Sequence, residues 1–138
     1  MTATLPREGD GMSIVRSVLA IAAGLMAVIV LSMVSDQAMV GLHYFPPLAQ
    51  YNAFSTEMLV VATLYRCVYA VLAGYITARL APSRPMLHAL ILGAIGTAFA
   101  LAGAILMWRL GTHWYPIALT VGALPCTLLG GRLAGPGR

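Results

Sequence analysis

Apolar residues in this chain gather into four long stretches, separated by short polar or Pro/Gly-containing segments. The stretches cover residues 14–35, 58–80, 86–108 and 114–133. An α-helix rises about 1.5 Å per residue, so a stretch of about 20 residues can span the roughly 30 Å hydrocarbon layer of a bilayer. The pattern predicts an all-α fold, a four-helix transmembrane bundle, in one domain over residues 13–135. Residues 1–12 are expected to be a disordered tail, and residues 136–138 a short C-terminal tail.

The composition supports a membrane class. The chain is 60% hydrophobic and 9% charged, whereas a soluble protein carries about 25% charged residues. The first stretch is longer than the roughly 7–15 apolar residues of a secretion signal, and no small-residue cleavage site follows it. We therefore expect this stretch to be retained as a helix.

The eight basic side chains are all arginines, and most of them lie at one set of stretch ends. Six share this side: Arg7, Arg16, Arg79, Arg84, Arg132 and Arg138. Arg109 lies at the opposite side, and Arg66 lies inside the second stretch. Positively charged loops stay in the cytoplasm, so both termini are predicted to be inside. Because the charge marks topology, the expected partner is the lipid bilayer and not nucleic acid.

A short pattern occurs twice and predicts a duplicated helical hairpin. GLHYFP begins at residue 41 and GTHWYP at residue 111, while ARLAP at 78–82 is matched by GRLAG at 131–135. The two hairpins would cover residues 13–82 and 83–135. Both start and end on the same side, so an axis along the membrane normal would relate them.

Small residues recur at helical spacing, which lets neighbouring helices approach closely within lipid. The positions expected to pack between helices are Gly24, Gly74, Ala89, Gly93, Gly96, Ala100, Gly103 and Gly122. Five of these lie in the third stretch. The sequence therefore predicts that the third helix makes the central contacts of the bundle.

Arg66 is the main candidate for a functional side chain, because a charge within a membrane span is costly and commonly functional. One interpretation is structural: Arg66 extends to the headgroups or pairs with Asp36, the acid near the end of the first stretch. The other is a ligand site, in which Arg66 contacts an anion or a lipid headgroup beside Tyr65 and Tyr69. The sequence leaves both open.

His43 and His113 form a second candidate pair, since the repeat would place them at one level. They could share a metal or haem, but their aromatic neighbours are also typical of an interfacial belt. No metal or cofactor is expected. Cys67 and Cys126 are predicted to lie roughly 18 and 9 Å from the inner ends of their helices, too far apart in depth to pair.

The segment GYITARLAPSRPMLHALILG, residues 74–93, resembles the inner loop of small, uncharacterised four-span bacterial membrane proteins. In these, a Gly-aromatic pair closes one helix, ARLAP forms the turn, and a Pro and a His open the next. The resemblance implies a bacterial inner-membrane location and brings no activity with it. The chain is also similar in size to small multidrug exporters, but it lacks the acid those carry within the first span.

No paired carboxylates, nucleophile elbow or phosphate loop is present, so the chain is not expected to be an enzyme. The leading hypothesis is a non-enzymatic interaction or accessory protein that contacts other membrane subunits or itself. The main alternative is a small transporter, or a lipid- or anion-binding protein, that uses Arg66. A second alternative is a metal or haem protein that uses His43 and His113.

Overall fold

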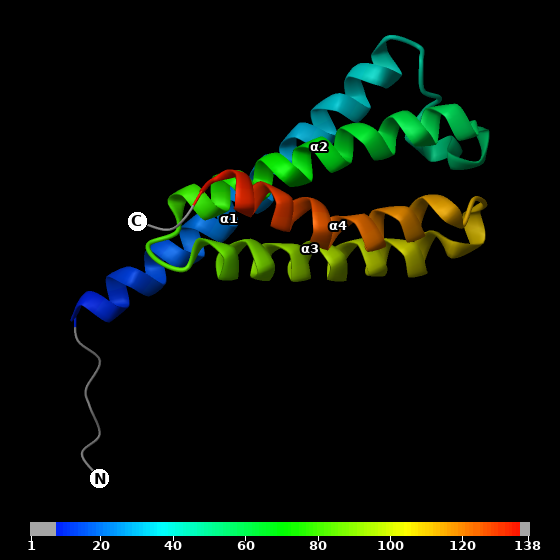
Figure 1. Ribbon diagram of the computed structural model, residues 1–138. Coiled ribbons are helices and arrows are strands. Elements are labelled where there is room, and N and C mark those ends of the chain that lie inside the picture. Colours follow the sequence, from blue (N-terminus) through cyan, green and yellow to red (C-terminus); the bar gives the residue numbers. More distant parts are fainter. Residues whose placement is uncertain (1–7, 136–138) are drawn as a thin grey trace.

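The computed structural model describes residues 8–135, so the predicted tail at 136–138 and most of the N-terminal tail lie outside the described residues. The described elements are α1 (Glu8–Gly41), η1 (Leu48–Ala53), α2 (Thr56–Leu80), α3 (Pro85–Met107), η2 (Trp108–Leu110) and α4 (Trp114–Leu133) (Figure 1). The four α-helices are each long and apolar enough to cross a membrane. The predicted all-α four-helix bundle is confirmed, and it fits a small multi-pass membrane protein.

Helix α1 is longer than predicted at both ends. Residues 8–12 were expected to be disordered, but they are helical, and the helix continues to Gly41. No proline interrupts this segment, and Asp10 lies in the first turn, where the positive end of the helix dipole favours an acid. The polar composition of residues 8–12 was therefore a poor guide to their structure.

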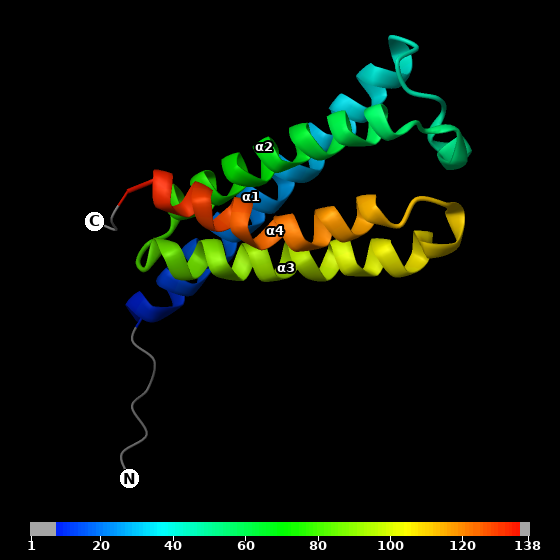
Figure 2. The ribbon, with the colours of Figure 1, turned by 45° about the vertical axis from the view of Figure 1, so that its right-hand side comes forward.

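The helices run back and forth along the bundle (Figures 1 and 2). The beginning of α1, the α2–α3 turn and the end of α4 share one end, called here the termini end. The two loops between α1 and α2 and between α3 and α4 share the other, called here the loop end. Arg16, Arg79, Arg84 and Arg132 belong to the termini end, and Arg109 to the loop end.

Helices α2 and α4 lie side by side in the middle of the bundle, with α1 packed mainly on α2 and α3 mainly on α4. The prediction that the third helix is central was wrong. Close helix contacts come from glycines that face the α2–α4 seam, where a β-carbon on Gly74 would overlap the carbonyl oxygen of Thr127. Gly130 packs equally closely on the carbonyl oxygen of Val71.

The α2–α4 seam also bears on the repeat. Gly74 precedes ARLAP by the same number of residues as Thr127 precedes GRLAG, and these two residues are in direct contact. Two parallel hairpins related by an axis along the bundle would place equivalent residues opposite one another in this way. Duplication of the hairpin nevertheless stays a prediction.

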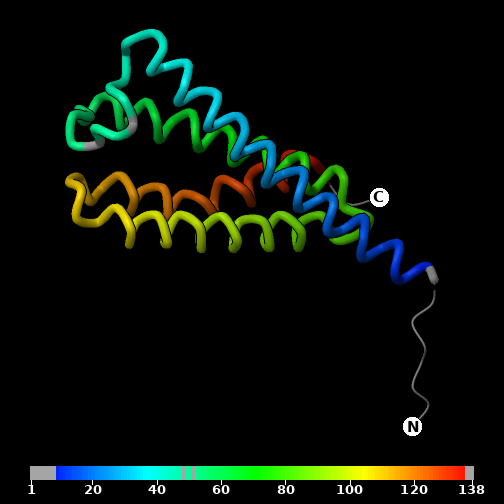
Figure 3. Tube along the Cα trace, turned by 180° about the vertical axis from the view of Figure 1, so that it is seen from behind, coloured from blue at the N-terminus to red at the C-terminus, as the bar shows by residue number. Residues whose placement is uncertain are grey.

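Helix α1 crosses the other helices most closely toward the termini end. Gly24 packs against Ala73 and Thr77 of α2 and against Leu92 of α3. The Thr77 hydroxyl is buried and donates a hydrogen bond of 3.1 Å to the carbonyl oxygen of Ala20. From this crossing point α1 and α3 diverge toward the loop end, as Figure 3 shows.

The long loop closes the loop end of α2 and α4. Phe45 is buried and packs in a cluster with Leu59 and Ala62 of α2 and Tyr115 of α4. Ser55 caps α2 by accepting a hydrogen bond from the backbone N–H of Met58. The loop is therefore a packed lid over this pair of helices, while α1 extends past it.

Candidate binding cavity

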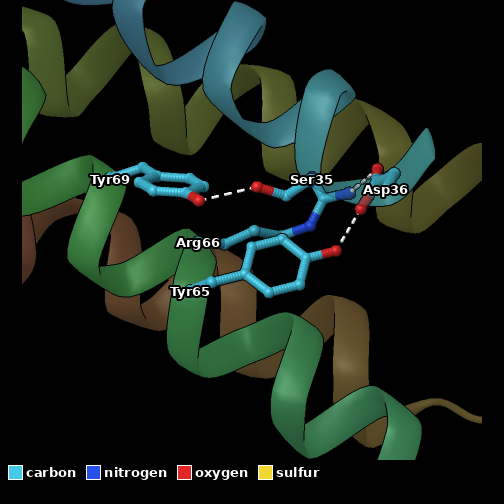
Figure 4. Close-up of polar contacts among 5 residues, drawn as sticks. All are labelled: Ser35, Asp36, Tyr65, Arg66 and Tyr69. Atoms are coloured by element: carbon cyan, nitrogen blue, oxygen red, sulfur yellow. Dashed lines mark hydrogen bonds and ion pairs between the residues drawn. The ribbon is translucent and has the colours of Figure 1, made fainter. Parts of the chain in front are cut away.

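Polar side chains join α1 to α2 in the loop-end half of the bundle (Figure 4). The Arg66 Nη2 atom donates to Asp36 Oδ2 at 2.5 Å, and the Tyr65 hydroxyl donates to Asp36 Oδ1. One turn along, the hydroxyls of Tyr69 and Ser35 are hydrogen-bonded at 2.6 Å. Residues 65 and 69 are four apart and so share one face of α2, which points this polar group at α1.

The Asp36–Arg66 pair is partly buried, with side-chain exposures of 15% and 31%. Its two charges balance each other, which lowers the free energy needed to hold either one within a membrane. The Tyr115 side chain of α4 lies close enough to interact electrostatically with Arg66. Arg66 Nε is buried and has no hydrogen-bond partner among the described residues.

A cavity of about 470 Å³ reaches this ion pair, and all four helices line it. Asp36 and Arg66 are its charged residues, and Ser32 and Thr127 also contribute polar atoms. The rest of the wall is almost entirely apolar. The small residues predicted for helix packing help to create this space, because Gly96, Ala100 and Gly122 line the cavity.

The mouth of the cavity lies between α1 and α3. Ile29 and Met33 of α1 and Phe99 of α3 line the cavity and are also exposed on the surface, Met33 at 61% and Phe99 at 63%. Helices α2 and α4 form the opposite wall, which is closed by their seam. The opening therefore faces the side of the bundle, where lipid would surround a membrane protein.

The remaining predicted packing positions fall into two groups. Gly24, Gly74, Ala89 and Gly93 are buried at helix contacts toward the termini end. Gly103 is different, because a β-carbon there would meet nothing within 4 Å.

Both interpretations of Arg66 describe part of what is observed. Arg66 pairs with Asp36, as the structural interpretation required, and it also lines a cavity, as the ligand-site interpretation required. Tyr65 and Tyr69 do not line this cavity and instead bind Asp36 and Ser35. The sequence did not reveal the cavity. The small residues Gly96, Ala100 and Gly122 were a signal for it, because they leave space between helices unless large side chains face them.

The histidines occupy the two loops at the loop end. The His113 ring stacks on Trp108 with centroids 4.1 Å apart, and its Nε2 atom is hydrogen-bonded to the Trp108 carbonyl oxygen at 2.9 Å. His43 is exposed in a turn and has a positive φ of 59°. Within residues 8–135, no group of three or more His, Cys, Asp or Glu side chains is arranged to hold a metal ion. His113 thus helps to close its own loop.

The two cysteines are neighbours, so the prediction that depth separates them was wrong. Cys67 and Cys126 interact through their thiols, both of which are free. They lie one helical turn from Val71 and Gly130, which are in contact across the seam. Arg79 lies two turns beyond Val71, whereas Arg132 follows Gly130 within one turn. The arginines used as depth markers are therefore not level with each other.

Comparison with known protein families, characterised proteins and solved structures finds no match to this chain.

Proposed function

We propose that this small multi-pass protein binds an amphipathic molecule in the cavity between α1 and α3 and holds or carries it within the membrane. The observation that supports this function is a laterally open, apolar cavity with one ion pair, Asp36–Arg66, at its loop-end side. The proposal includes no catalytic step.

The properties of the cavity support a ligand more than a defect in packing. Binding sites for small molecules are commonly about 300–1,000 Å³ and combine apolar walls with a few polar groups. The cavity volume of about 470 Å³ falls in this range. A charge within a span is also retained chiefly where it serves a function. These features favour the lipid- or anion-binding alternative over a bundle closed by packing alone.

The accessory role, with other membrane subunits or self-association as its basis, stays a prediction. It would not by itself require a cavity that reaches the ion pair. The two roles can be separated by filling the cavity, because that change leaves the outer surface of the bundle almost unaltered.

The test is to replace Gly96 with Leu. A β-carbon at Gly96 has its nearest neighbour, Ala123 Cβ, at 4.0 Å, so a larger side chain can enter the cavity without striking the backbone. Gly103→Leu is the matched control, since it adds the same atoms to the same helix in open space. Native mass spectrometry of detergent-purified protein should show a retained amphiphile in wild type and Gly103→Leu, and none in Gly96→Leu. Equal retention in all three would contradict the proposal.

We also propose an orientation, with the termini end in the cytoplasm and the bundle in a bacterial inner membrane. Arg16, Arg79, Arg84 and Arg132 at this end, against Arg109 at the other, support it through the positive-inside rule. Reporter fusions after Arg84 should be active in the cytoplasm, and a fusion near Gln50 should be active outside. The opposite pattern would reverse the orientation.

A further inference from the structure

We infer that the ligand carries an oxyanion headgroup, a carboxylate or a phosphate, which binds the Arg66 guanidinium, and that its single apolar chain runs from there toward the termini end. This inference rests on the proposed function and specifies the chemistry of the ligand. It follows from which hydrogen-bonding groups around the cavity are already used and which are free.

Both carboxylate oxygens of Asp36 already accept a hydrogen bond, which uses about half of the roughly four lone-pair sites of the group. Its Oδ1 atom accepts a hydrogen bond from Tyr65 and its Oδ2 atom accepts one from Arg66. Its charge is also matched by the guanidinium. A cationic headgroup would therefore have to share these oxygens with Tyr65 and Arg66.

The donor capacity of Arg66 is largely free. A guanidinium has five N–H donors in a planar fork and binds a carboxylate most strongly through two parallel hydrogen bonds. Here Arg66 binds Asp36 through Nη2 alone, and Nε has no partner within residues 8–135. Nε is itself buried, but the Arg66 side chain as a whole is 31% exposed. The donors that a ligand can reach therefore belong to a cation, and oxygen acceptors with negative charge satisfy them best.

Two tyrosines keep the pair in this one-bond arrangement. Tyr65 holds Oδ1 of Asp36 away from the guanidinium. Tyr69 binds the hydroxyl of Ser35, the residue that precedes Asp36 in α1. Tyr65 and Tyr69 act as positioning residues, because neither lines the cavity. They leave Arg66 charged, fixed and incompletely bonded at the edge of an apolar space.

The shape of the cavity sets the direction of the apolar chain. Lining residues extend along α1 from Asp36 back to Leu25 and along α4 from Leu119 to Thr127. At 1.5 Å per residue these segments are roughly 16 and 12 Å long. The cavity ends where α1 crosses α3, because Gly24 packs on Leu92 there. An extended chain enters between Met33 and Phe99 and lies along this wall.

The experiment compares probes that share one chain and differ in headgroup. Decanoate, decyl phosphate, decanol and decyltrimethylammonium are titrated separately against the purified full chain at pH 8, and bound states are counted by native mass spectrometry. We expect decanoate or decyl phosphate to bind at least tenfold more tightly than decanol and decyltrimethylammonium. A hydrogen-bonded charge contributes about 1.5–3 kcal/mol, which corresponds to roughly ten- to a hundredfold in affinity. The tighter of the two anions identifies the oxyanion.

Variants then assign this preference to Arg66. Arg66→Leu should remove the advantage of the anionic probes while decanol still binds. Arg66→Lys keeps the charge but loses the planar fork, so it should retain only part of the advantage, and it serves if Arg66→Leu folds poorly. Arg109→Leu removes one positive charge outside the cavity and should change nothing.

The outcomes separate this inference from the proposed function. If all four probes bind alike in wild type, or the cationic probe binds best, the oxyanion assignment is overturned. If binding in that case is still lost in Gly96→Leu, the cavity remains a binding site for a ligand of other chemistry. If no probe distinguishes Gly96→Leu from Gly103→Leu, both proposals fall.

Discussion

The two ends of the bundle hold the same four helices together in different ways. At the termini end, backbones touch: Gly24 lies against the carbonyl oxygen of Ala73, and Gly130 lies against that of Val71. At the loop end, α1 stands away from α3 and is tied to α2 by polar side chains, chiefly Asp36 with Arg66. The first arrangement fills space and the second leaves it open.

The difference shows which contacts shape the cavity in a helical bundle that is surrounded by lipid. Lipid gives helices little hydrophobic reason to associate, so close van der Waals contact or hydrogen bonding must hold them. Here close contact at one end sets the crossing of α1 over α3, and divergence from that point opens space at the other. Where the backbones no longer touch, the polar group keeps α1 attached together with Met39 and Val40, which pack against the Phe45 cluster.

The largest expected effect is loss of the close seam. Gly130→Ala would force its β-carbon into the Val71 carbonyl, so α2 and α4 must separate, and overpacking of this kind costs about 3 kcal/mol. The measurement is unfolding in increasing SDS followed by circular dichroism. Gly103→Ala is the control, and removing a helical glycine in open space should stabilise the protein by up to about 1 kcal/mol. Similar stability in both variants would contradict the comparison of the two ends.

Removal of one charge at the loop end should have the next largest effect. Asp36→Ala leaves Arg66 unpaired within the span, and we expect about 1–3 kcal/mol of destabilisation in the same assay. Asp36→Ala combined with Arg66→Leu should recover much of the loss, because an absent ion pair is better tolerated than half of one. A double variant less stable than Asp36→Ala would mean that Arg66 stabilises the fold independently of Asp36.

The Ser35–Tyr69 hydrogen bond should contribute less. Tyr69→Phe removes only the hydroxyl, and interhelical hydrogen bonds in membranes average about 0.6 kcal/mol. Tyr75→Phe, an exposed tyrosine on the same helix, is the control and should be neutral. A loss of several kcal/mol in Tyr69→Phe would show that this contact, more than the ion pair, attaches α1.

Cross-linking of the two cysteines tests how α2 and α4 are aligned along their seam, and we expect it to change stability least. Oxidation with copper phenanthroline should join Cys67 to Cys126 within one chain, because the two thiols are already neighbours. Mass spectrometry after maleimide treatment should then show both thiols protected, and Cys67→Ser should leave Cys126 reactive. Two reactive thiols after oxidation would place α4 in a different register against α2.

Much of the fold follows from residues that act locally. The ends of α2, α3 and α4 were predicted closely, because polar segments and prolines such as Pro85 mark them. The start of α1 was missed because a short polar segment can join a long helix at little cost. The choice of central helix was also missed. Counting small residues does not reveal which of them meet a partner, as the open position at Gly103 shows.

The candidate site was predictable in its pairing and not in its surroundings. Asp36 and Arg66 could be matched from the sequence, since both were placed toward the same end of adjacent helices. The cavity depends on the crossing of α1 over α3, which Gly24 and its three-dimensional neighbours set. The hydrogen bonds of Tyr65 and Tyr69 likewise depend on the direction in which each side chain points. Their positions in the sequence do not specify that direction.

The placement of the ion pair on consecutive helices also bears on how the chain enters a bilayer during synthesis. An unpaired arginine near the middle of a span adds about 2.5–3.5 kcal/mol to the free energy of insertion. Asp36 precedes Arg66 in the chain and lies on the helix that emerges first. When α2 reaches the translocation machinery, its counter-ion is therefore already made. Insertion of α1 and α2 together, as one hairpin, would present Arg66 to the bilayer already paired with Asp36.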